Sequence, residues 1–475
     1  MSDPLWTFEK ALAATAGQAE GDDRPELTSV SIDSRTLEPG ALFAAIRGDK
    51  FDGHDYVGQA FEAGAAAALV AQDAKLDVSG ALIRVPDTLD ALNRLGAAAR
   101  ARSEARIIAV TGSAGKTGTK EALRLALGAS GRVHVSEKSY NNHWGVPLSL
   151  ANFARADDFG VFEAGMNHAG EITPLTRLIR PHIAIITTVA PVHLEFFGTV
   201  EKIAEAKAEI FAGLEPGGVA ILNRDEPHFA FLNSCARKAG AERVITFGAH
   251  KSADVRLMES RTVGDASEVG AQIGGEHISY RIGAPGRHLV MNSLAVLAAL
   301  EAVGADLQAG AQALGGYRAQ TGRGARTQFA LGDGRVTLID ESYNANPASM
   351  RAALAALAET PRAELPRRIA VLGDMLELGE TSCQLHAELA QPVDAAGVDV
   401  VFACGPHMRA LYDTLPETRR GAYAINSVGL EAALLETVRA GDVVMVKGSL
   451  GSRMGLVVEA LMDMACILPR AANGE

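Results

Sequence analysis

The chain has 475 residues, 48% of them hydrophobic and 21% charged, which predicts about three domains and excludes an intrinsically disordered chain. Its net charge of −12 argues against general nucleic-acid binding, because domains that bind a phosphate backbone are normally basic. Four cysteines without metal-ligand spacing exclude a disulfide framework and a structural zinc site.

The first segment, residues 1–86, is typical of a small α/β domain. Short β-rich runs at Ala41–Ile46 and Ala81–Val85 surround an Ala-rich stretch that we expect to form one helix. A helix over Thr88–Ala101 then leads into a strand over Arg106–Val110. The N-terminus is mixed and charged, and no apolar run approaches the ~20 residues that cross a bilayer. We therefore expect a cytoplasmic protein with no membrane insertion.

Residues 87–322 form the predicted central domain. Apolar runs at Phe159–Glu163, Ile183–Val189 and Val219–Leu222 are typical of buried strands, and each is followed by a loop or a helix. This alternation indicates a parallel sheet. Residues 252–282 instead alternate polar and apolar positions with turn signals, which predicts antiparallel strands with a structural role.

Residues 323–475 begin a second alternating series. Four strand candidates, separated by predicted helices, stand at Val336–Asp340, Arg368–Leu372, Val400–Cys404 and Val443–Lys447. The sequence therefore predicts a second open α/β sheet at the C-terminal end.

A glycine-rich loop, Thr111–Thr117, follows the strand Arg106–Val110 and opens a helix predicted to run from Lys120 to Gly128. Such a loop turns backbone N–H groups and a helix N-terminus toward one anion, so it indicates an ATP or GTP site; a structural glycine turn is the alternative. The strict pattern has Gly where this chain has Val110. The predicted phosphate-loop residues are Gly112, Ser113, Ala114, Gly115, Lys116, Thr117 and Gly118.

Two further side chains follow central strands. Glu163 ends one strand, and His193 comes just after another. Ligands gather at the carboxyl ends of the strands of an open α/β sheet, so both would reach the same edge as Lys116. Together with Thr117 they are candidate magnesium-site residues, although a lone Glu or His is often only a satisfied core or surface group.

Lys207 lies on the apolar face of a helix predicted over Glu201–Leu214. It stands four residues after Ile203 and three before Ile210, in the row that faces the core. A buried lysine needs a partner, a shifted pKa or a modification. The alternative is a lysine whose stem packs while its ammonium reaches water.

Together these residues resemble the Mur ligase family, and the match covers nearly the whole chain. The first domain contributes DSR (Asp33–Arg35) and DGH (Asp52–His54). The other matching segments are, in order, TGSAGKT, YNNHWGVP (Tyr140–Pro147), FEAGMNHAGEI (Phe162–Ile172), HLEFFG (His193–Gly198), AKAEIF (Ala206–Phe211), GRHLVMNSLAVLAA (Gly286–Ala299) and DESYNANPASM (Asp340–Met350).

The resemblance implies a three-domain enzyme with an N-terminal UDP-sugar domain, a central P-loop ATPase domain and a Rossmann-like C-terminal domain. Such enzymes are ATP-dependent ligases of peptidoglycan biosynthesis that activate a carboxylate as an acyl phosphate. VLGDMLELGE (Val371–Glu380) and the SYNANP run make the chain most similar to members that add D-alanyl-D-alanine to UDP-N-acetylmuramoyl-tripeptide. These small-molecule substrates, and a monomer, are the partners we expect. A Mur-type ligase with another acceptor and an ATP-dependent switch are the alternatives.

By position, the resemblance implies that Lys116, His193 and Lys207 are catalytic and that two Mg²⁺ ions bind. Thr117 and Glu163 would hold one ion, and His193 with a carbamylated Lys207 would hold the other. The matching nucleotide-binding residues are Asn142, Asn292, Arg323 and Asp340. Without the family, the last three are a polar helix residue, a linker charge and a strand-end cap.

The predicted substrate residues come from the two outer domains. Ser34 and Arg35 would contact the UDP group, whereas Asp52 and His54 either contact it or hold the shape of their loop. The candidates for the incoming dipeptide are Asn344, Asn346, Asp374, Lys447 and Ser449. Asn346, before Pro347, is equally explained as a helix start. Leu289 and Thr188 depart from the family pattern near the predicted adenine contacts.

Overall fold

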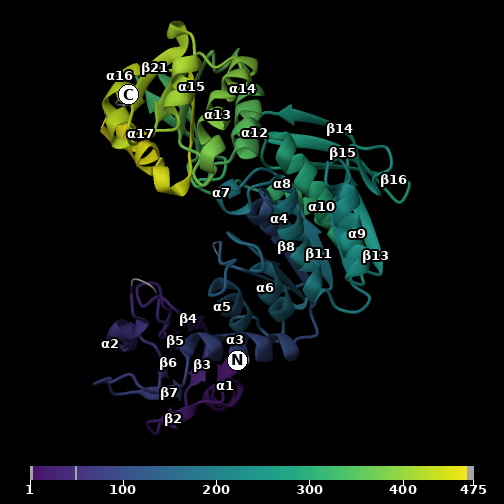
Figure 1. Cartoon of the computed structure of the whole chain (residues 1–475), viewed down its shortest axis with the longest axis vertical. Helices are drawn as coiled ribbons and strands as arrows, with labels where there is room; N and C mark the ends of the chain where they lie inside the picture. Colours follow the sequence, from purple (N-terminus) through teal and green to yellow (C-terminus); the bar gives the residue numbers. More distant parts are fainter. Residues whose placement is uncertain (1–3, 49–50, 138, 468–475) are drawn as a thin grey trace, which may run out of the picture.

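The computed structural model describes residues 4–48, 51–137 and 139–467. Three larger sheets follow one another along the described chain, with the N-terminal sheet at one end and the C-terminal sheet at the other (Figure 1). None of the helices in these ranges is both long and apolar enough to cross a bilayer.

The N-terminal sheet has five strands in the order β2-β7-β6-β5-β4 and is accompanied by a two-stranded pair, β1-β3. The predicted single Ala-rich helix is wrong: the stretch breaks at Gly64, which has φ +101°, into the helix α2 and the strand β6. All five residues of β6 are buried between β5 and β7, and this burial outweighs the helix propensity of alanine. The elements are β1 (Trp6–Thr7), α1 (Phe8–Thr15), β2 (Gln18–Glu20), β3 (Glu26–Leu27), β4 (Val30–Ser31), β5 (Leu42–Ala44), α2 (Val57–Glu62), β6 (Ala67–Ala71) and β7 (Ala81–Val85).

The central sheet has nine strands in the order β16-β15-β14-β13-β12-β11-β8-β10-β9. The strands from β9 to β13 are parallel, whereas β14, β15 and β16 form the predicted antiparallel extension. The strand predicted to reach Val189 ends at Ile186. The strands are β8 (Arg106–Thr111), β9 (Val133–Val135), β10 (Phe159–Glu163), β11 (Ile183–Ile186), β12 (Val219–Asn223), β13 (Arg243–Gly248), β14 (Val255–Val263), β15 (Ala266–Ile273) and β16 (Glu276–Ile282).

Helices cover both faces of the central sheet, which explains why its parallel strands are mostly apolar. The helices α4 and α10 pack on one face, and α5, α6, α8 and α9 pack on the other. The helices are α3 (Thr88–Ala101), α4 (Lys116–Gly128), α5 (Gly145–Ala151), α6 (Ile172–Ile179), α7 (Leu194–Phe197), α8 (Val200–Ala208), α9 (Phe229–Lys238), α10 (Arg287–Val303) and α11 (Leu307–Ala313).

The C-terminal sheet has six strands in the order β17-β18-β22-β19-β20-β21, parallel except for the β17-β18 pair. The four predicted strands are present as β18, β19, β20 and β22, while β17 and β21 were not predicted. The strands are β17 (Ala325–Leu331), β18 (Gly334–Glu341), β19 (Arg367–Gly373), β20 (Val400–Cys404), β21 (Arg420–Ala424) and β22 (Asp442–Lys447). The helices are α12 (Pro347–Ala358), α13 (Ser382–Ala387), α14 (Ala390–Ala395), α15 (Arg409–Thr414), α16 (Glu431–Thr437) and α17 (Gly455–Ile467).

The helix α3 joins the N-terminal and central sheets. Its residues Leu92 and Leu95 are part of the N-terminal hydrophobic core, while Gly96 lies close to Pro147 of α5 in the central domain. Trp6 Nε1 also donates a hydrogen bond to Ala151 O at 2.8 Å. The helix therefore packs against both units, and domain boundaries near residues 86 and 322 stay predictions.

Candidate active site between the central and C-terminal sheets

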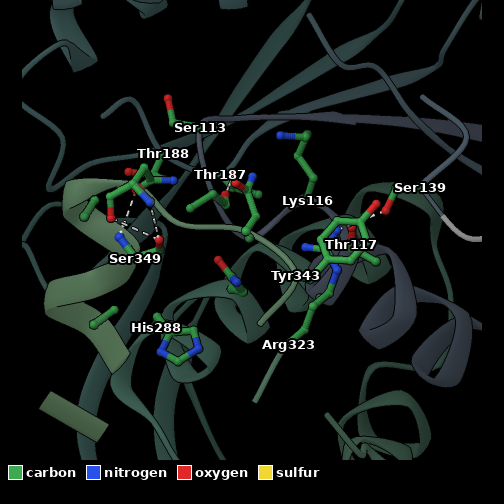
Figure 2. Close-up of a pocket in the computed structure, with 18 of the residues that line it drawn as sticks. Ser113, Lys116, Thr117, Ser139, Thr187, Thr188, His288, Arg323, Tyr343 and Ser349 are labelled. Carbon is green, nitrogen blue, oxygen red and sulfur yellow. Dashed lines mark hydrogen bonds between the residues drawn. The ribbon is translucent and has the colours of Figure 1, made fainter. Parts of the chain in front are cut away.

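A pocket of about 530 Å³ lies between the phosphate loop and the first strand–helix connection of the C-terminal sheet (Figure 2). Its central-domain wall includes Ser113 to Gly118, Asn141, Met166, Asn167, Thr187, Thr188, His193 and Asn292. Its C-terminal wall includes Arg323, Glu341, Tyr343, Asn344, Asn346, Ser349 and Lys447. One cavity thus gathers predicted nucleotide residues and predicted dipeptide residues from two domains.

The glycines of the phosphate loop adopt backbone conformations that other residues rarely take. Gly112 has φ +149°, and a Cβ placed there would lie 1.9 Å from Thr187 Oγ1. Gly115 has φ +84° and precedes α4, which begins at Lys116 and not at the predicted Lys120. The helix N-terminus therefore opens directly into the pocket, where its N–H groups can bind phosphate oxygens.

Val110, which replaces the first glycine of the strict pattern, lies inside the strand β8. It is fully buried and pairs with Glu163 of β10 and Ile185 of β11. At this position the chain packs the sheet core, so the loop conformation does not depend on a glycine there.

Lys116 places its ammonium inside the loop that precedes it. Its Nζ donates to Gly112 O at 2.6 Å. Burial lowers the pKa of Lys116, Glu163 opposes this change, and Arg323 adds to it. Lys116 is thus a cation held at the point where the helix dipole also favours an anion.

Glu163 is completely buried beside the start of α4. Its Oε2 accepts hydrogen bonds from Thr117 Oγ1 at 3.4 Å and Asn141 Nδ2 at 3.3 Å, while its Oε1 has no hydrogen-bond partner. A buried carboxylate with one oxygen unsatisfied, next to a hydroxyl, is a donor set that suits Mg²⁺. The residues Thr117 and Glu163 therefore fit one metal ion.

Lys120 is a neighbour of Glu163 that the sequence analysis missed. It is 1% exposed, its Nζ lies 3.7 Å from Glu163 Oε1, and it donates to Ser136 O at 2.5 Å. The available signal was its spacing, because a residue four positions after Lys116 lies on the same helix face. Lys120 Nζ also lies 3.3 Å from Glu121 Oε1, so its charge offsets both that carboxylate and the buried Glu163.

Lys207 is buried at the end of α8, with 1% of its surface exposed. Its ammonium does not reach water, so the alternative of a lysine with a solvated head is wrong. Burial lowers the pKa of Lys207 well below its usual value, and the nearby Lys116 lowers it further. The predicted helix to Leu214 instead ends at Ala208 and continues as a short 3₁₀ turn.

His193 stands where the central domain meets the C-terminal domain. It has a left-handed backbone, φ +53°, and its Nδ1 pairs with Glu377, which also has a positive φ of +62°. Burial lowers the pKa of His193, Glu377 opposes this effect, and Lys207 and Lys116 strengthen it. His193 lines the same pocket as Lys116. Glu377 was not predicted, since only the tertiary fold brings it to His193.

The second predicted metal site is less complete. Among the residues that the structure describes, no three His, Cys, Asp or Glu side chains converge to hold a metal ion. His193 and an unmodified lysine are too few ligands for Mg²⁺, which prefers oxygen donors. This site would need an added oxygen donor on Lys207.

The predicted nucleotide residues divide into two groups. Asn292 lies against Gly115, with its amide nitrogen 2.7 Å from the position of a Cβ there. Arg323 lies over the Tyr343 ring at 4.1 Å and donates to Ser139 Oγ at 3.0 Å (Figure 2). Asp340 and Asn142 do not line the pocket. Asp340 accepts from Gly322 N and from Ser342, and Asn142 caps the start of α5 by accepting from Trp144 N and Gly145 N.

Three of the predicted dipeptide residues line the pocket, namely Asn344, Asn346 and Lys447. Lys447 Nζ lies 3.1 Å from Glu341 Oε2 and donates to Asn344 O at 2.9 Å. Asn346 begins α12 through a reciprocal capping box with Ser349, as the helix-start alternative expects.

The other two lie behind the wall of the pocket. Asp374 accepts from His407 N and Met408 N, and Ser449 Oγ accepts from Leu376 N and donates to Ala345 O. These contacts shape the loops that carry Leu376 and Ala345.

The predicted UDP residues lie in the N-terminal domain, outside this pocket. Ser34 Oγ donates to Gln59 Oε1, and the exposed Arg35 pairs with Asp33 at 2.7 Å. Asp52 accepts from His54 N and lies 2.5 Å from His54 Nδ1, while His54 Nε2 accepts from Ala71 N. The geometry of Asp52 and His54 fits the alternative in which they hold the shape of their loop.

Several further pocket residues were not predicted as site residues. His288 and Tyr343 lie inside the quoted family segments, whereas Tyr317 and Thr187 lie outside all of them, and the two departures Leu289 and Thr188 also line the cavity. Burial lowers the pKa of His288 and raises the pKa of Tyr317 to about 12, which keeps both side chains neutral near pH 7. Spacing could not find them, because they come from separate strands and helices.

Models of known protein families match most of the chain. The Mur ligase family catalytic domain matches residues 26–86, the Mur ligase middle domain matches residues 110–300, and the Mur ligase glutamate ligase domain matches residues 325–450.

Named relatives agree with these matches. The chain is 32% identical to UDP-N-acetylmuramoyl-tripeptide–D-alanyl-D-alanine ligase of Rickettsia prowazekii over 96% of this chain and 99% of that protein. It is 34% identical to the Escherichia coli protein of that name over 94% of this chain and 96% of that protein.

Solved structures also match over nearly the full length. A crystal structure of MurF from Acinetobacter baumannii has a TM-score of 0.83 at 29% identity and covers 96% of this chain and 99% of that one. MurF from Thermotoga maritima in complex with ADP has a TM-score of 0.76 at 25% identity, covering 92% and 97%.

Proposed function

The chain belongs to the Mur ligase family, and we propose that it joins D-alanyl-D-alanine to UDP-N-acetylmuramoyl-tripeptide at the expense of ATP. The observation that carries the proposal is the pocket in which an intact phosphate loop faces C-terminal residues, in a chain similar over almost its whole length to ligases of that name. The product would be the UDP-N-acetylmuramoyl-pentapeptide of peptidoglycan synthesis.

The chemistry begins with a carboxylate, which is a poor electrophile. Transfer of the ATP γ-phosphoryl group to the terminal carboxylate of the tripeptide creates an acyl phosphate with a good leaving group. The amine of D-alanyl-D-alanine then attacks the acyl carbon, and the tetrahedral intermediate collapses to the amide and phosphate. ADP is the other product.

The phosphoryl group moves past the start of α4. The N–H groups from Gly115 onward and the Lys116 ammonium face the position of the transferred phosphate and stabilise its charge. Asn292 lies against the other side of Gly115 and orients the nucleotide. Arg323, held by Tyr343 and Ser139, brings a further cation from the linker.

Thr117 and Glu163 would hold a magnesium ion, whose chemistry is to offset the negative charge of the phosphates. For a second ion, we propose that Lys207 is carbamylated. Burial favours its neutral amine, and CO₂ reacts with neutral amines to give a carbamate. The carbamate would supply an oxygen ligand for the second ion beside His193.

The incoming dipeptide would enter from the C-terminal wall. Asn344, Asn346 and Lys447 face the same cavity as Lys116, so an amine bound there meets an acyl phosphate on the central-domain wall. Contacts such as the His193–Glu377 pair hold the two walls together and help to exclude water from the acyl phosphate. The enzyme would act as a monomer in the cytoplasm.

The test is ADP release with UDP-N-acetylmuramoyl-tripeptide, measured with and without D-alanyl-D-alanine. We expect release that requires both substrates. Release that ignores D-alanyl-D-alanine but requires another amino acid would show a Mur-type ligase with a different acceptor. ATP hydrolysis without any acceptor, together with a partner protein that binds differently in the ATP and ADP states, would show a nucleotide switch.

A further inference from the structure

A second pocket, of about 370 Å³, lies beside the active site between the helices α7 and α8 and the loop before α6. We call it the α7–α8 pocket, and it is lined by His168, Ala169, Phe196, Phe197, Lys202, Glu205, Ala206 and Glu209. Two continuous segments of chain line both the active-site pocket and the α7–α8 pocket. Met166 and Asn167 line the first pocket where His168 and Ala169 line the second, and His193 is followed by α7.

We propose that the α7–α8 pocket binds the side chain of the third residue of the tripeptide and favours one that ends in both an ammonium and a carboxylate, as in diaminopimelate. This inference rests on the proposed function. The carboxylate to be phosphorylated belongs to the third residue, so the side chain of that residue must lie within a few bond lengths of the transferred phosphate. The α7–α8 pocket is one turn of helix beyond His193, which is within that reach.

Most polar groups around the pocket are already satisfied and form its wall. Glu209 accepts from Gly170 N at 2.6 Å and from Thr173 N and Oγ1 at 2.9 and 3.0 Å, which fixes the loop before α6. His168 pairs with Glu171 at 3.1 Å, and its ring lies 4.6 Å from that of Phe196. These contacts build a wall before any ligand arrives.

Two opposite charges on the pocket are left for a ligand. Within the described residues, Lys202 and Glu205 form no ion pair with each other or with a third side chain, and both are exposed. They lie three residues apart on α8 and therefore project from the same face of the helix. An ammonium of the ligand would meet Glu205, and a carboxylate on the same carbon would meet Lys202.

Phe196 supplies the apolar part of the pocket. This residue is 47% exposed, although a phenylalanine of a folded protein is usually buried. The aliphatic stem of lysine or diaminopimelate could pack on this ring. A lysine side chain would contact Phe196 and Glu205 but would leave Lys202 without a partner. We therefore expect diaminopimelate to bind more tightly than lysine.

The experiment measures KM for two substrates, tripeptides that end in lysine or in meso-diaminopimelate. We expect the intact protein to have about fivefold lower KM for the diaminopimelate form, as one partly exposed ion pair provides. Lys202→Met should raise KM for that form about fivefold and leave KM for the lysine form unchanged. Glu205→Gln should raise KM for both forms. Calorimetric binding of each tripeptide without ATP should show the same pattern.

Matched controls lie on the same face of the fold but outside the pocket. Glu201→Gln on α8 and Lys238→Met on α9 each remove one charge of the same sign as the test variants, at exposed positions. Both should leave the two KM values unchanged. Three results would each overturn the proposed role of the pocket. They are equal KM values for the two tripeptides, a preference for the lysine form, and a Lys202→Met variant that keeps the preference for diaminopimelate. Absence of ADP release that depends on D-alanyl-D-alanine, with either tripeptide, would instead overturn the proposed function.

Discussion

The polar residues of the central domain and those of the N-terminal domain are organised in opposite ways. In the central domain, Lys207 is buried without an ion pair among the described residues, and Glu163 keeps one carboxylate oxygen unsatisfied. In the N-terminal domain, Arg35 pairs with Asp33, and Asp52 pairs with His54. Unsatisfied buried groups cost stability unless a ligand arrives, so the central domain is built around its ligands, whereas the N-terminal loops hold their shape alone.

The largest effect should come from the phosphate loop. Lys116→Ala removes the cation at the start of α4 and should lower kcat by about 10³-fold or more, since the transferred phosphate loses a charge-stabilising donor. Binding of the UDP substrate, measured by calorimetry, should be kept, because its predicted residues lie in another domain. A variant that fails to fold would show that the loop has a structural role.

The next effect should be on stability. Lys120→Met removes the cation that faces the buried Glu163, and it should lower the free energy of unfolding by about 3–5 kcal/mol, as the loss of one member of a buried ion pair does. Urea unfolding measures this change. Arg124→Met removes an exposed cation from the same helix and should have little effect. Equal stability of the two variants would contradict a pairing role for Lys120.

A third change tests the proposed carbamate. Lys207→Ala should lower kcat about 10²-fold or more, because the second set of metal ligands is lost. Acetate or another short carboxylate should restore part of the activity by placing an oxygen donor in the vacated space. Full activity of Lys207→Ala without any carboxylate would exclude the carbamate.

The N-terminal domain should respond more mildly. Arg35→Ala should raise KM for the UDP substrate about tenfold, the effect of losing one charge-assisted contact, and should leave KM for ATP unchanged. Arg24→Ala removes another exposed arginine of this domain and serves as the control. Unchanged KM for the UDP substrate in Arg35→Ala would mean that Arg35 only pairs with Asp33.

The last effect concerns the pH dependence of stability and the sheet beside the site. Burial between Phe153 and Phe162 lowers the pKa of His134 to about 4, whereas the unfolded chain has a histidine pKa near 6.5. The unfolded state thus binds the extra proton between these two values, and stability should fall with falling pH across that window, by at most about 1.4 kcal/mol per pH unit. Urea unfolding at pH 7 and pH 5 should show a smaller loss for His134→Leu. An equal loss would place the acid sensitivity elsewhere.

Local sequence patterns predicted best those site residues that lie close together in the sequence. The residues from Ser113 to Thr117 lie next to one another on one strand–loop–helix unit, and Lys207 was found from helix periodicity alone. Glu377 lies in the quoted segment Val371–Glu380, but nothing in that segment indicates its contact with His193, which spans 184 residues of sequence. The prediction of one Ala-rich helix in the first domain was wrong, because burial within the sheet made part of that segment a strand. Helix propensity does not take such burial into account.

The sequence by itself determined the α/β class, the phosphate loop, the buried lysine and the family resemblance, because each depends on neighbours within a few residues or on matched motifs. Only the tertiary structure decided which predicted residues face a ligand. It put Asn344 and Lys447 on the pocket wall and turned Asp340 and Asp374 toward backbone N–H groups. The physical reason is that the direction of a side chain depends on how separate elements pack, and that packing also created the α7–α8 pocket.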